Sequence, residues 1–325
     1  MLKEKIKFFL YYLIKLFSKK KLALDSELEI LLEKKIPPLH INYNTYYVFN
    51  QAKYKQSFIN NYLFNYFYNI ISELDKKRKE KKIYDILHFP KFLDLGCGFG
   101  PLALAINLNI LSKKKLNINL KDNDIIYCGT DIRKDCINFL KNAYKDEKNF
   151  YFHRHVGNSS LNDVDYVGNF NKFKPQENKT VFASDGSETL YSLPFNYKCD
   201  VQWSSSFFTH LTSQAFENAL KFINQCLDED GLAINSFLIL DNESYLSIKT
   251  GNSDRSNNYI YDFGNFVSTD FKNPLICTIY KLEFIEESFK NNGLKIKYIQ
   301  KGSWRGCNYK NNYSHCQDII VAEKY

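Results

Sequence analysis

The sequence has no hydrophobic run long enough to cross a membrane. Near its N-terminus the uninterrupted apolar stretch is only residues 8–14, whereas a spanning helix needs about 20 residues. No cleavage site of small residues follows, so we expect no secretory signal peptide. The eight cysteines are scattered without a Cys-x-x-Cys pair, which excludes the usual pattern of a zinc site. We therefore predict no metal and an ordinary reduced, cytoplasmic protein.

Positive charge is scarce outside one segment of the chain. The formal net charge is +8, but residues 1–21 carry seven lysines and only one acidic residue, Glu4. The remainder is close to neutral, which argues against a broad nucleic-acid-binding surface. A hydrophobic content of 44% and a charged content of 25% indicate a globular protein, and 325 residues are enough for a sizeable core. The abundance of Asn, Lys, Ile and Tyr we attribute to AT-rich codons.

Residues 1–21 have the pattern of an amphipathic helix. Apolar side chains from Leu2 to Phe17 fall on one helical face, and most lysines fall on the other. One interpretation is a helix that lies on an anionic membrane surface, peripheral to the inner membrane of a bacterium. The other is a helix packed on the protein's own body. A second helix is expected over about 51–77, so we assign 1–83 to an N-terminal helical extension and 84–325 to the main domain.

The main domain begins with a strand, a glycine-rich turn and a helix. The apolar run Phe92–Leu95 predicts a buried strand, after which glycines alternate at 96, 98 and 100 and a helical pattern starts at Pro101. Glycines there allow positive φ and close approach of a ligand, and we expect the N–H groups of the turn and helix to face that ligand. Pro101 stands where a dinucleotide fingerprint has its third glycine. Asp94, inside the motif, suits a ligand with an ammonium group better than a pyrophosphate.

Strands and helices alternate along the rest of the domain. Further strands are expected at 125–130, 150–156, 200–203, 232–240, 294–299 and 318–322. Helices are expected at 134–144, from a cap at Ser213 to a stop at Gly231, and at about 283–291. A polar and aromatic segment, 241–275, interrupts the repeat. This order predicts an open α/β sheet with a ligand at the carboxyl ends of strands one, two and four, where Asp131 can accept from ribose hydroxyls.

Four ordered stretches resemble class I S-adenosylmethionine (SAM) methyltransferases, and a bacterial subgroup of them in particular. They are FLDLGCGFG (92–100), SSSFFTHL (204–211), the fifth strand (231–240) and GSWRG…QDIIVAEK (302–324). The resemblance implies a Rossmann-like, seven-stranded, mostly parallel sheet whose last strand is antiparallel. It also implies SAM as the cofactor.

The resemblance further implies roles for individual residues. Asp94 and the three glycines of the turn would meet the methionyl end of SAM, Asp131 would hold its ribose, and Ser204 and Ser205 would flank its sulfonium. Relatives carry an acid after strand three that reads adenine; Asn158 stands in that region here. The candidate cofactor contacts are Asp94, Gly96, Cys97, Gly98, Gly100, Asp131, Ile132, Asn158, Ser204 and Ser205.

His210, just after strand four, is the candidate catalytic base. An alcohol acceptor benefits from a base whose pKa is near neutrality, and histidine suits that role. The alternative is a histidine that caps the next helix or satisfies a backbone carbonyl. Trp304 and Arg305 are candidates for the acceptor's entrance, since an arginine fork suits phosphate or carboxylate. The alternative for Arg305 is an ordinary solvated surface residue.

The sequence is compatible with three functions. The first is an O-methyltransferase for a small-molecule or glycan-type acceptor, selected by a lid of residues 37–74 and 241–275. The second is a nicotinamide-dependent oxidoreductase, for which the third glycine and a hydride-handling pair are missing. The third is a SAM-binding scaffold without activity. The sequence does not determine the oligomeric state.

Overall fold

The computed structural model describes residues 34–35, 90–114, 125–155, 191–254, 261–268, 270–272, 274–306, 309 and 316–325. Apart from Lys34 and Lys35, the N-terminal extension predicted for 1–83 lies outside these ranges. Asn158 lies outside them as well. None of the helices in the described ranges is long and apolar enough to span a bilayer.

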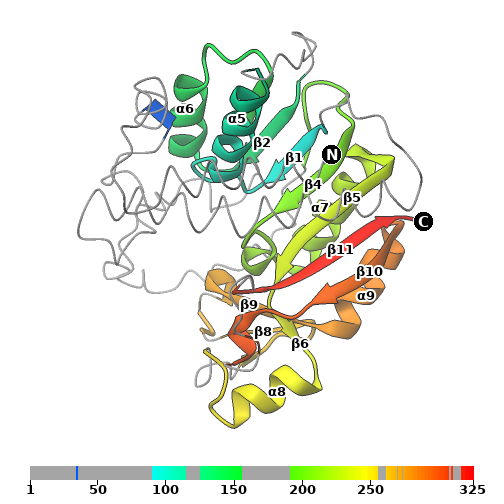
Figure 1. Ribbon diagram of the computed structural model, residues 1–325. Helices are drawn as coiled ribbons and strands as arrows, with labels where there is room; N and C mark the ends of the chain where they lie inside the picture. The colour runs from blue at the N-terminus through cyan, green and yellow to red at the C-terminus, as the bar shows by residue number, and fades with distance from the viewer. Residues whose placement is uncertain are drawn as a thin grey trace.

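A seven-stranded sheet organises the domain (Figure 1). Its order is β3-β2-β1-β4-β5-β11-β10, with β11 antiparallel to both of its neighbours and the pairs from β3 to β5 parallel. The predicted fold class, including the antiparallel last strand, is confirmed. The strands are β1 (Phe92–Leu95), β2 (Tyr127–Asp131), β3 (Phe150–Arg154), β4 (Cys199–Ser204), β5 (Leu227–Phe237), β10 (Leu294–Gln300) and β11 (Asp318–Lys324).

Helices cover both faces of this sheet, because its strands carry apolar side chains on both sides. On one face, α5 (Pro101–Lys114) and α6 (Lys134–Ala143) pack against side chains such as Phe92 and Val201. On the other, α7 (Ser213–Cys226) and α9 (Leu282–Asn291) pack against side chains such as Leu93 and Leu95. Adjacent residues of β1 thus belong to different cores, as the alternation of a strand requires.

A small second sheet forms where the sequence suggested only an interruption. Its order is β6 (Ile239–Leu240), β9 (Thr278–Lys281), β8 (Phe266–Ser268) and β7 (Tyr261–Asp262). The segment 241–275 also contains α8 (Asn242–Lys249), which Figure 1 shows below this sheet, and leads into η4 (Pro274–Ile276). The expected fifth strand, 232–240, is divided at Leu238, because Ile239 and Leu240 pair with β9 and not with the main sheet. Tertiary pairing decided this division.

Two expected helix boundaries are wrong for local reasons. Thr212, not Ser213, caps α7: its backbone is extended and its Oγ1 accepts from the N–H of Ala215 at 3.2 Å. The helix ends at Cys226 and not at Gly231, because Leu227 already has extended backbone and begins β5. Gly231 lies within that strand.

Lys35 fastens part of the N-terminal region to the domain. Its side chain is 3% exposed, and its Nζ donates to Oδ1 of Asn107 at 3.0 Å and to Oε1 of Glu147 at 2.7 Å. The ammonium also lies 4.3 Å from the ring centre of Tyr144. Burial lowers the pKa of Lys35, opposed by the contact with Glu147. At least this part of the extension therefore packs beside α5 and α6.

Candidate functional site

The carboxyl ends of β1, β2 and β4 meet at one edge of the sheet. In the strand register, Leu95 lies opposite Thr130 on one side and Ser204 on the other. Each of these residues is followed at once by a candidate site residue: Gly96, Asp131 and Ser205. The parallel pairing thus brings three separate sequence motifs together, as expected for a ligand site in an open α/β sheet.

The three glycines of the turn have left-handed backbone, with φ of 70° at Gly96, 52° at Gly98 and 73° at Gly100. Their surroundings differ. A Cβ at Gly100 would lie 2.5 Å from Cδ2 of the buried Leu140, and one at Gly96 would lie 2.9 Å from Cδ2 of Phe207. At Gly98 no described atom lies within 4 Å of that position, apart from those of the glycine and its two chain neighbours. Packing therefore requires glycine at Gly96 and Gly100, whereas none of the described residues packs against a Cβ at Gly98.

Asp131 closes over the turn. Its Oδ2 accepts from the N–H of Gly98 and its Oδ1 from the N–H of Arg133, both at 2.8 Å. Burial raises the pKa of Asp131, and the two N–H groups, that of Arg133 first, oppose the increase. The N–H groups of Gly96 and Cys97 donate to the carbonyl of Thr130. The expectation that the N–H groups of the turn face a ligand is therefore wrong for these three, because Asp131 and β2 already bind them.

Asp94 lies at the base of the turn, 4% exposed, where its Oδ2 accepts from the hydroxyl of Tyr127 at 2.6 Å. Burial raises its pKa to about 7; the Tyr127 hydroxyl opposes this, and the negative charge of Asp131 adds to it. The carboxyl group is thus poised to titrate near neutrality. Cys97 is also buried, and burial raises the pKa of its thiol. The sequence offered no signal that Tyr127 is the partner of Asp94.

The strand-four motif is held by a chain of buried polar groups. Ser204 is fully buried and donates to Oδ1 of Asn235 at 2.6 Å. Ser206 has a left-handed φ of 56°, and its N–H donates to Oγ of Ser236 at 2.7 Å. Ser236 in turn donates to Oε1 of Gln317. Backbone strain of this kind persists only where the surroundings fix it, and here they do so at the edge that carries the candidate site.

His210 ends the short helix η3 (Phe208–His210), which follows this motif. Its ring is exposed, and its Nδ1 lies 3.0 Å from the carbonyl oxygen of Leu275. Because a carbonyl only accepts, Nδ1 carries the proton and Nε2 has the lone pair of the neutral ring. Phe207, at the start of the same segment, packs on Gly96. One segment therefore contacts the glycine turn and presents His210.

Arg305 is buried, so the expectation of a solvated arginine is wrong. Its Nε donates to Oδ1 of Asp318 at 2.7 Å, its Nη1 to both oxygens of Asp241 at 2.8 Å, and its Nη2 to Asp318 and to the carbonyl of Ile239. Trp304, 3% exposed, also donates to Asp318, at 2.9 Å. These contacts occupy the guanidinium, which leaves it no role at an acceptor's entrance. They tie η5 (Ser303–Arg305) and β11 to the start of α8.

Two further positions flank the turn. Ile132, next to Asp131, is 37% exposed and offers an apolar surface beside the site. His155, just after β3, is 3% exposed and packs among the rings of His153, Tyr191 and Phe222. Within the described part of the chain its Nε2 has no hydrogen-bond partner. Burial lowers its pKa to about 4, and His153 contributes to the decrease.

The donor set of this edge fits a SAM-like ligand. Among the described residues no group of three His, Cys, Asp or Glu side chains could hold a metal ion. Two carboxyl groups, Asp94 and Asp131, lie at a turn whose middle glycine has no side chain of the described residues beside it. Carboxylates there can accept from an ammonium or from ribose hydroxyls.

No protein-family model matches the chain. Among solved structures it is similar to a SAM-dependent methyltransferase from Clostridium acetobutylicum, with 15% identity over 77% of this chain and 89% of that one and a TM-score of 0.39. It is also similar to magnesium protoporphyrin IX methyltransferase from Synechocystis with bound S-adenosylhomocysteine (13% identity, 86% and 91% covered, TM-score 0.40). A TehB-like SAM-dependent methyltransferase from Corynebacterium glutamicum has 16% identity, with 79% and 100% covered and a TM-score of 0.36. At such scores the likeness carries no weight alone, and the fold assignment stands on the strand order of this chain.

Proposed function

We propose that this chain is a SAM-dependent methyltransferase that methylates a hydroxyl group of a small-molecule or glycan-type acceptor. The observation that supports it most is the glycine turn at the carboxyl end of β1. Its middle residue, Gly98, has left-handed backbone, open space where a Cβ would lie, and the Asp131 carboxylate on its N–H. Such a turn lets a ligand approach the backbone closely, and the nearby carboxylates stabilise a positive charge on that ligand.

In this proposal Asp131 accepts from the ribose hydroxyls and Ile132 gives the adenine ring an apolar surface. Gly96, Gly98 and Gly100 let the methionyl end approach, and Asp94 supplies negative charge beneath it. Cys97 and Ser205 lie next to these groups, and Ser204 holds the strand-four segment through Asn235. Asn158 keeps its proposed contact with adenine. SAM supplies a methyl group already activated on a positively charged sulfur.

The chain's own part in the chemistry is to orient the acceptor, to exclude water and to take a proton. His210 is the proposed base. The carbonyl of Leu275 holds its Nδ1–H, so that Nε2 can accept the proton of the acceptor hydroxyl as the oxygen attacks. Placing His210 on η3 fixes it to the segment that also packs on the glycine turn through Phe207.

Two measurements test the proposal. Calorimetry of the full chain with S-adenosylhomocysteine should show binding, and labelled SAM should transfer its methyl group to hydroxyl acceptors. His210→Gln should lower kcat by about 10²–10⁴-fold with unchanged affinity for S-adenosylhomocysteine. His153→Gln, a half-buried strand histidine, is the matched control.

The outcomes separate the alternatives. Transfer to amines but to no hydroxyl would overturn the O-methyltransferase assignment. Tight binding of S-adenosylhomocysteine with no turnover would favour the scaffold, and binding of NADH in its place would favour the oxidoreductase.

Residues 1–21 enter the proposal as an anchor on an anionic membrane surface. The support for it is the sequence pattern, in which seven lysines accompany apolar residues at helical spacing. Co-sedimentation with anionic liposomes should be lost when residues 1–21 are removed. Equal pelleting of the two chains would show that the segment is not an anchor.

A further inference from the structure

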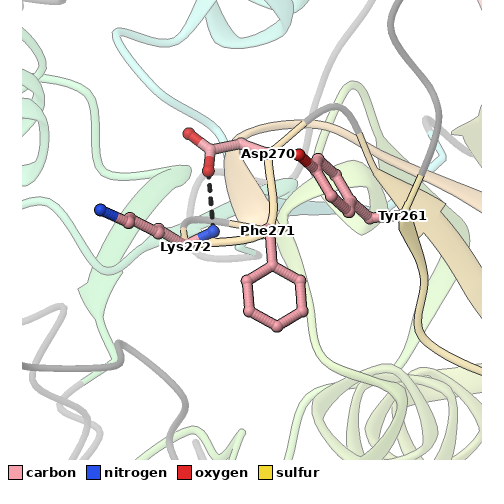
Figure 2. A pocket seen from close by; sticks show the side chains of 4 residues that line it. All are labelled: Tyr261, Asp270, Phe271 and Lys272. Atoms are coloured by element: carbon pink, nitrogen blue, oxygen red, sulfur yellow. Dashed lines mark hydrogen bonds between the residues drawn. The ribbon is translucent and has the colours of Figure 1, made fainter.

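A pocket of about 360 Å³ lies on the small second sheet, away from the glycine turn. It is lined by Tyr261, Asp270, Phe271 and Lys272 (Figure 2). Its volume is at the lower end of the range for small-molecule sites. We propose that this pocket binds a pyranose ring of the acceptor, so that the acceptor is a neutral glycan or glycoside. The identification of the sugar as the methyl acceptor rests on the proposed function, whereas the binding test below does not.

The pocket has an aromatic wall that faces solvent. Phe271 is 55% exposed, although large apolar side chains are usually covered. Its ring centre lies 5.6 Å from that of Tyr261 and 6.0 Å from that of Phe263. The rings of Tyr261 and Phe271 are inclined by 54° and so form no parallel-sided slot for a flat aromatic ligand. An inclined pair suits the apolar C–H face of a sugar ring.

Polar groups of both signs stand beside these rings. Asp270 is oriented by the N–H of Lys272, which donates to its Oδ1 at 2.8 Å (Figure 2). A carboxylate accepts from several hydroxyl groups, whereas the Lys272 ammonium only donates. Among the described lining residues there is one charge of each sign, so neither sign predominates. In our proposal, a neutral ring with many hydroxyl groups contacts both polar side chains and the aromatic wall together.

The pocket lies close along the chain to Leu275, the residue whose carbonyl holds the proposed base. Three residues after Lys272, the carbonyl of Leu275 holds Nδ1 of His210 at 3.0 Å. The same small sheet is tied to α7 through Asn265, whose Nδ2 donates to Oγ of Ser213 at 3.1 Å. In our proposal, a saccharide seated on Tyr261 and Phe271 extends toward His210 along the segment that leads from Lys272 to Leu275.

Ligand-observed saturation-transfer NMR on the full chain tests this without any cofactor. The probes are methyl glycosides of glucose, galactose, mannose and N-acetylglucosamine, with p-cresol as the planar aromatic competitor. We expect at least one glycoside to bind more tightly than p-cresol. Phe271→Ala should raise its Kd about tenfold, because a ring contact is lost. Asp270→Asn should also weaken it. Tyr245→Ala removes an aromatic ring that is 57% exposed on α8, outside the pocket, and should change nothing.

Any of three results would overturn the inference: no glycoside binds, p-cresol binds better, or Phe271→Ala and Tyr245→Ala have equal effects. Thermal melting of each variant checks folding, and Asp270→Asn provides a second variant that leaves the exposed ring in place. Calorimetry with S-adenosylhomocysteine is run on the same samples. Its failure with glycoside binding intact would reject the methyltransferase and keep the sugar site, and the reverse pattern would reject only the sugar site.

Discussion

Substituting alanine at Gly98 and at Gly100 separates ligand binding from packing within one turn. Both glycines have left-handed backbone, which costs an L-residue about 1–2 kcal/mol. At Gly98 the added methyl group meets no neighbour in the part of the chain that the structure describes, so we expect that cost to be the whole cost to stability. At Gly100 the methyl group would lie 2.5 Å from Cδ2 of the fully buried Leu140, which adds roughly 1–3 kcal/mol of overpacking.

The expected melting temperatures follow from these energies. For a domain of this size, each kcal/mol corresponds to about 2–4 °C. Gly98→Ala should therefore lower the melting temperature by about 2–8 °C, and Gly100→Ala by roughly 4–20 °C. If the open space beside Gly98 receives the cofactor, its alanine variant should lose at least about tenfold in affinity for S-adenosylhomocysteine, or about 1.4 kcal/mol.

Differential scanning calorimetry and isothermal titration calorimetry on the two purified variants make the comparison. The reasoning is refuted if Gly98→Ala binds S-adenosylhomocysteine as the unaltered chain does. It is also refuted if the two variants are destabilised equally, since the environments of the two glycines would then not differ as the structure has them.

Three further predictions concern stability. The pKa of Asp94 is about 7 in the folded chain, above its unfolded value of 3.8, so its contribution to folding stability is complete below about pH 4 and is lost as the pH rises through 7. The pKa of His155 is about 4 in the folded chain, below its unfolded value of 6.5, so its contribution to folding stability is complete above pH 6.5 and is lost on acidification. Denaturant titrations from pH 5 to pH 8 measure the free energy of unfolding. Asp94→Asn should remove a decline of this free energy with rising pH, and His155→Phe should remove an opposing increase. If the slopes against pH are unchanged, the assigned pKa shifts are contradicted. Asp318→Asn should cost about 3–5 kcal/mol, because it removes the fully buried one of the two carboxylates that balance the Arg305 guanidinium, and a loss below about 1 kcal/mol in chemical denaturation would count against that pair. Lys35→Met should cost about 1–2 kcal/mol in the same assay through its lost contacts, whereas the exposed Lys34→Met should cost nothing; equal effects would show that Lys35 does not fasten the extension.

The C-terminal motif supports the candidate site through hydrogen bonds without lying at the glycine turn. Gln317 accepts from Ser236, which holds the strained Ser206 at the end of β4, while the next residue, Asp318, binds Arg305 and Trp304. Gln317, just before β11, and Asp318, its first residue, thus brace the candidate site and the small sheet separately. The Gln-Asp pair of this stretch thus has a structural role, although neither side chain lies at the glycine turn.

Several features of this chain could be predicted from its sequence because local patterns encode them. Periodicity identified all seven strands of the main sheet, and the order of strands and helices gave its parallel core. The alternating glycines and Pro101 located the turn at the start of α5, since only glycine readily adopts left-handed backbone there. These properties depend on residues close together in the chain.

Tertiary structure decided what depends on residues far apart. The sequence could not reveal that Tyr127 binds Asp94, that Asp131 occupies the N–H of Gly98, or that Arg305 is buried between two aspartates. Nor could it reveal that Ile239 and Leu240 leave the main sheet to pair with β9, and so form the sheet that carries the pocket. Each of these contacts joins groups that are more than 30 residues apart in the sequence, except that Arg305 and Asp318 are separated by 13 residues. Packing chooses such partners by fit and desolvation, and no spacing along the chain specifies them.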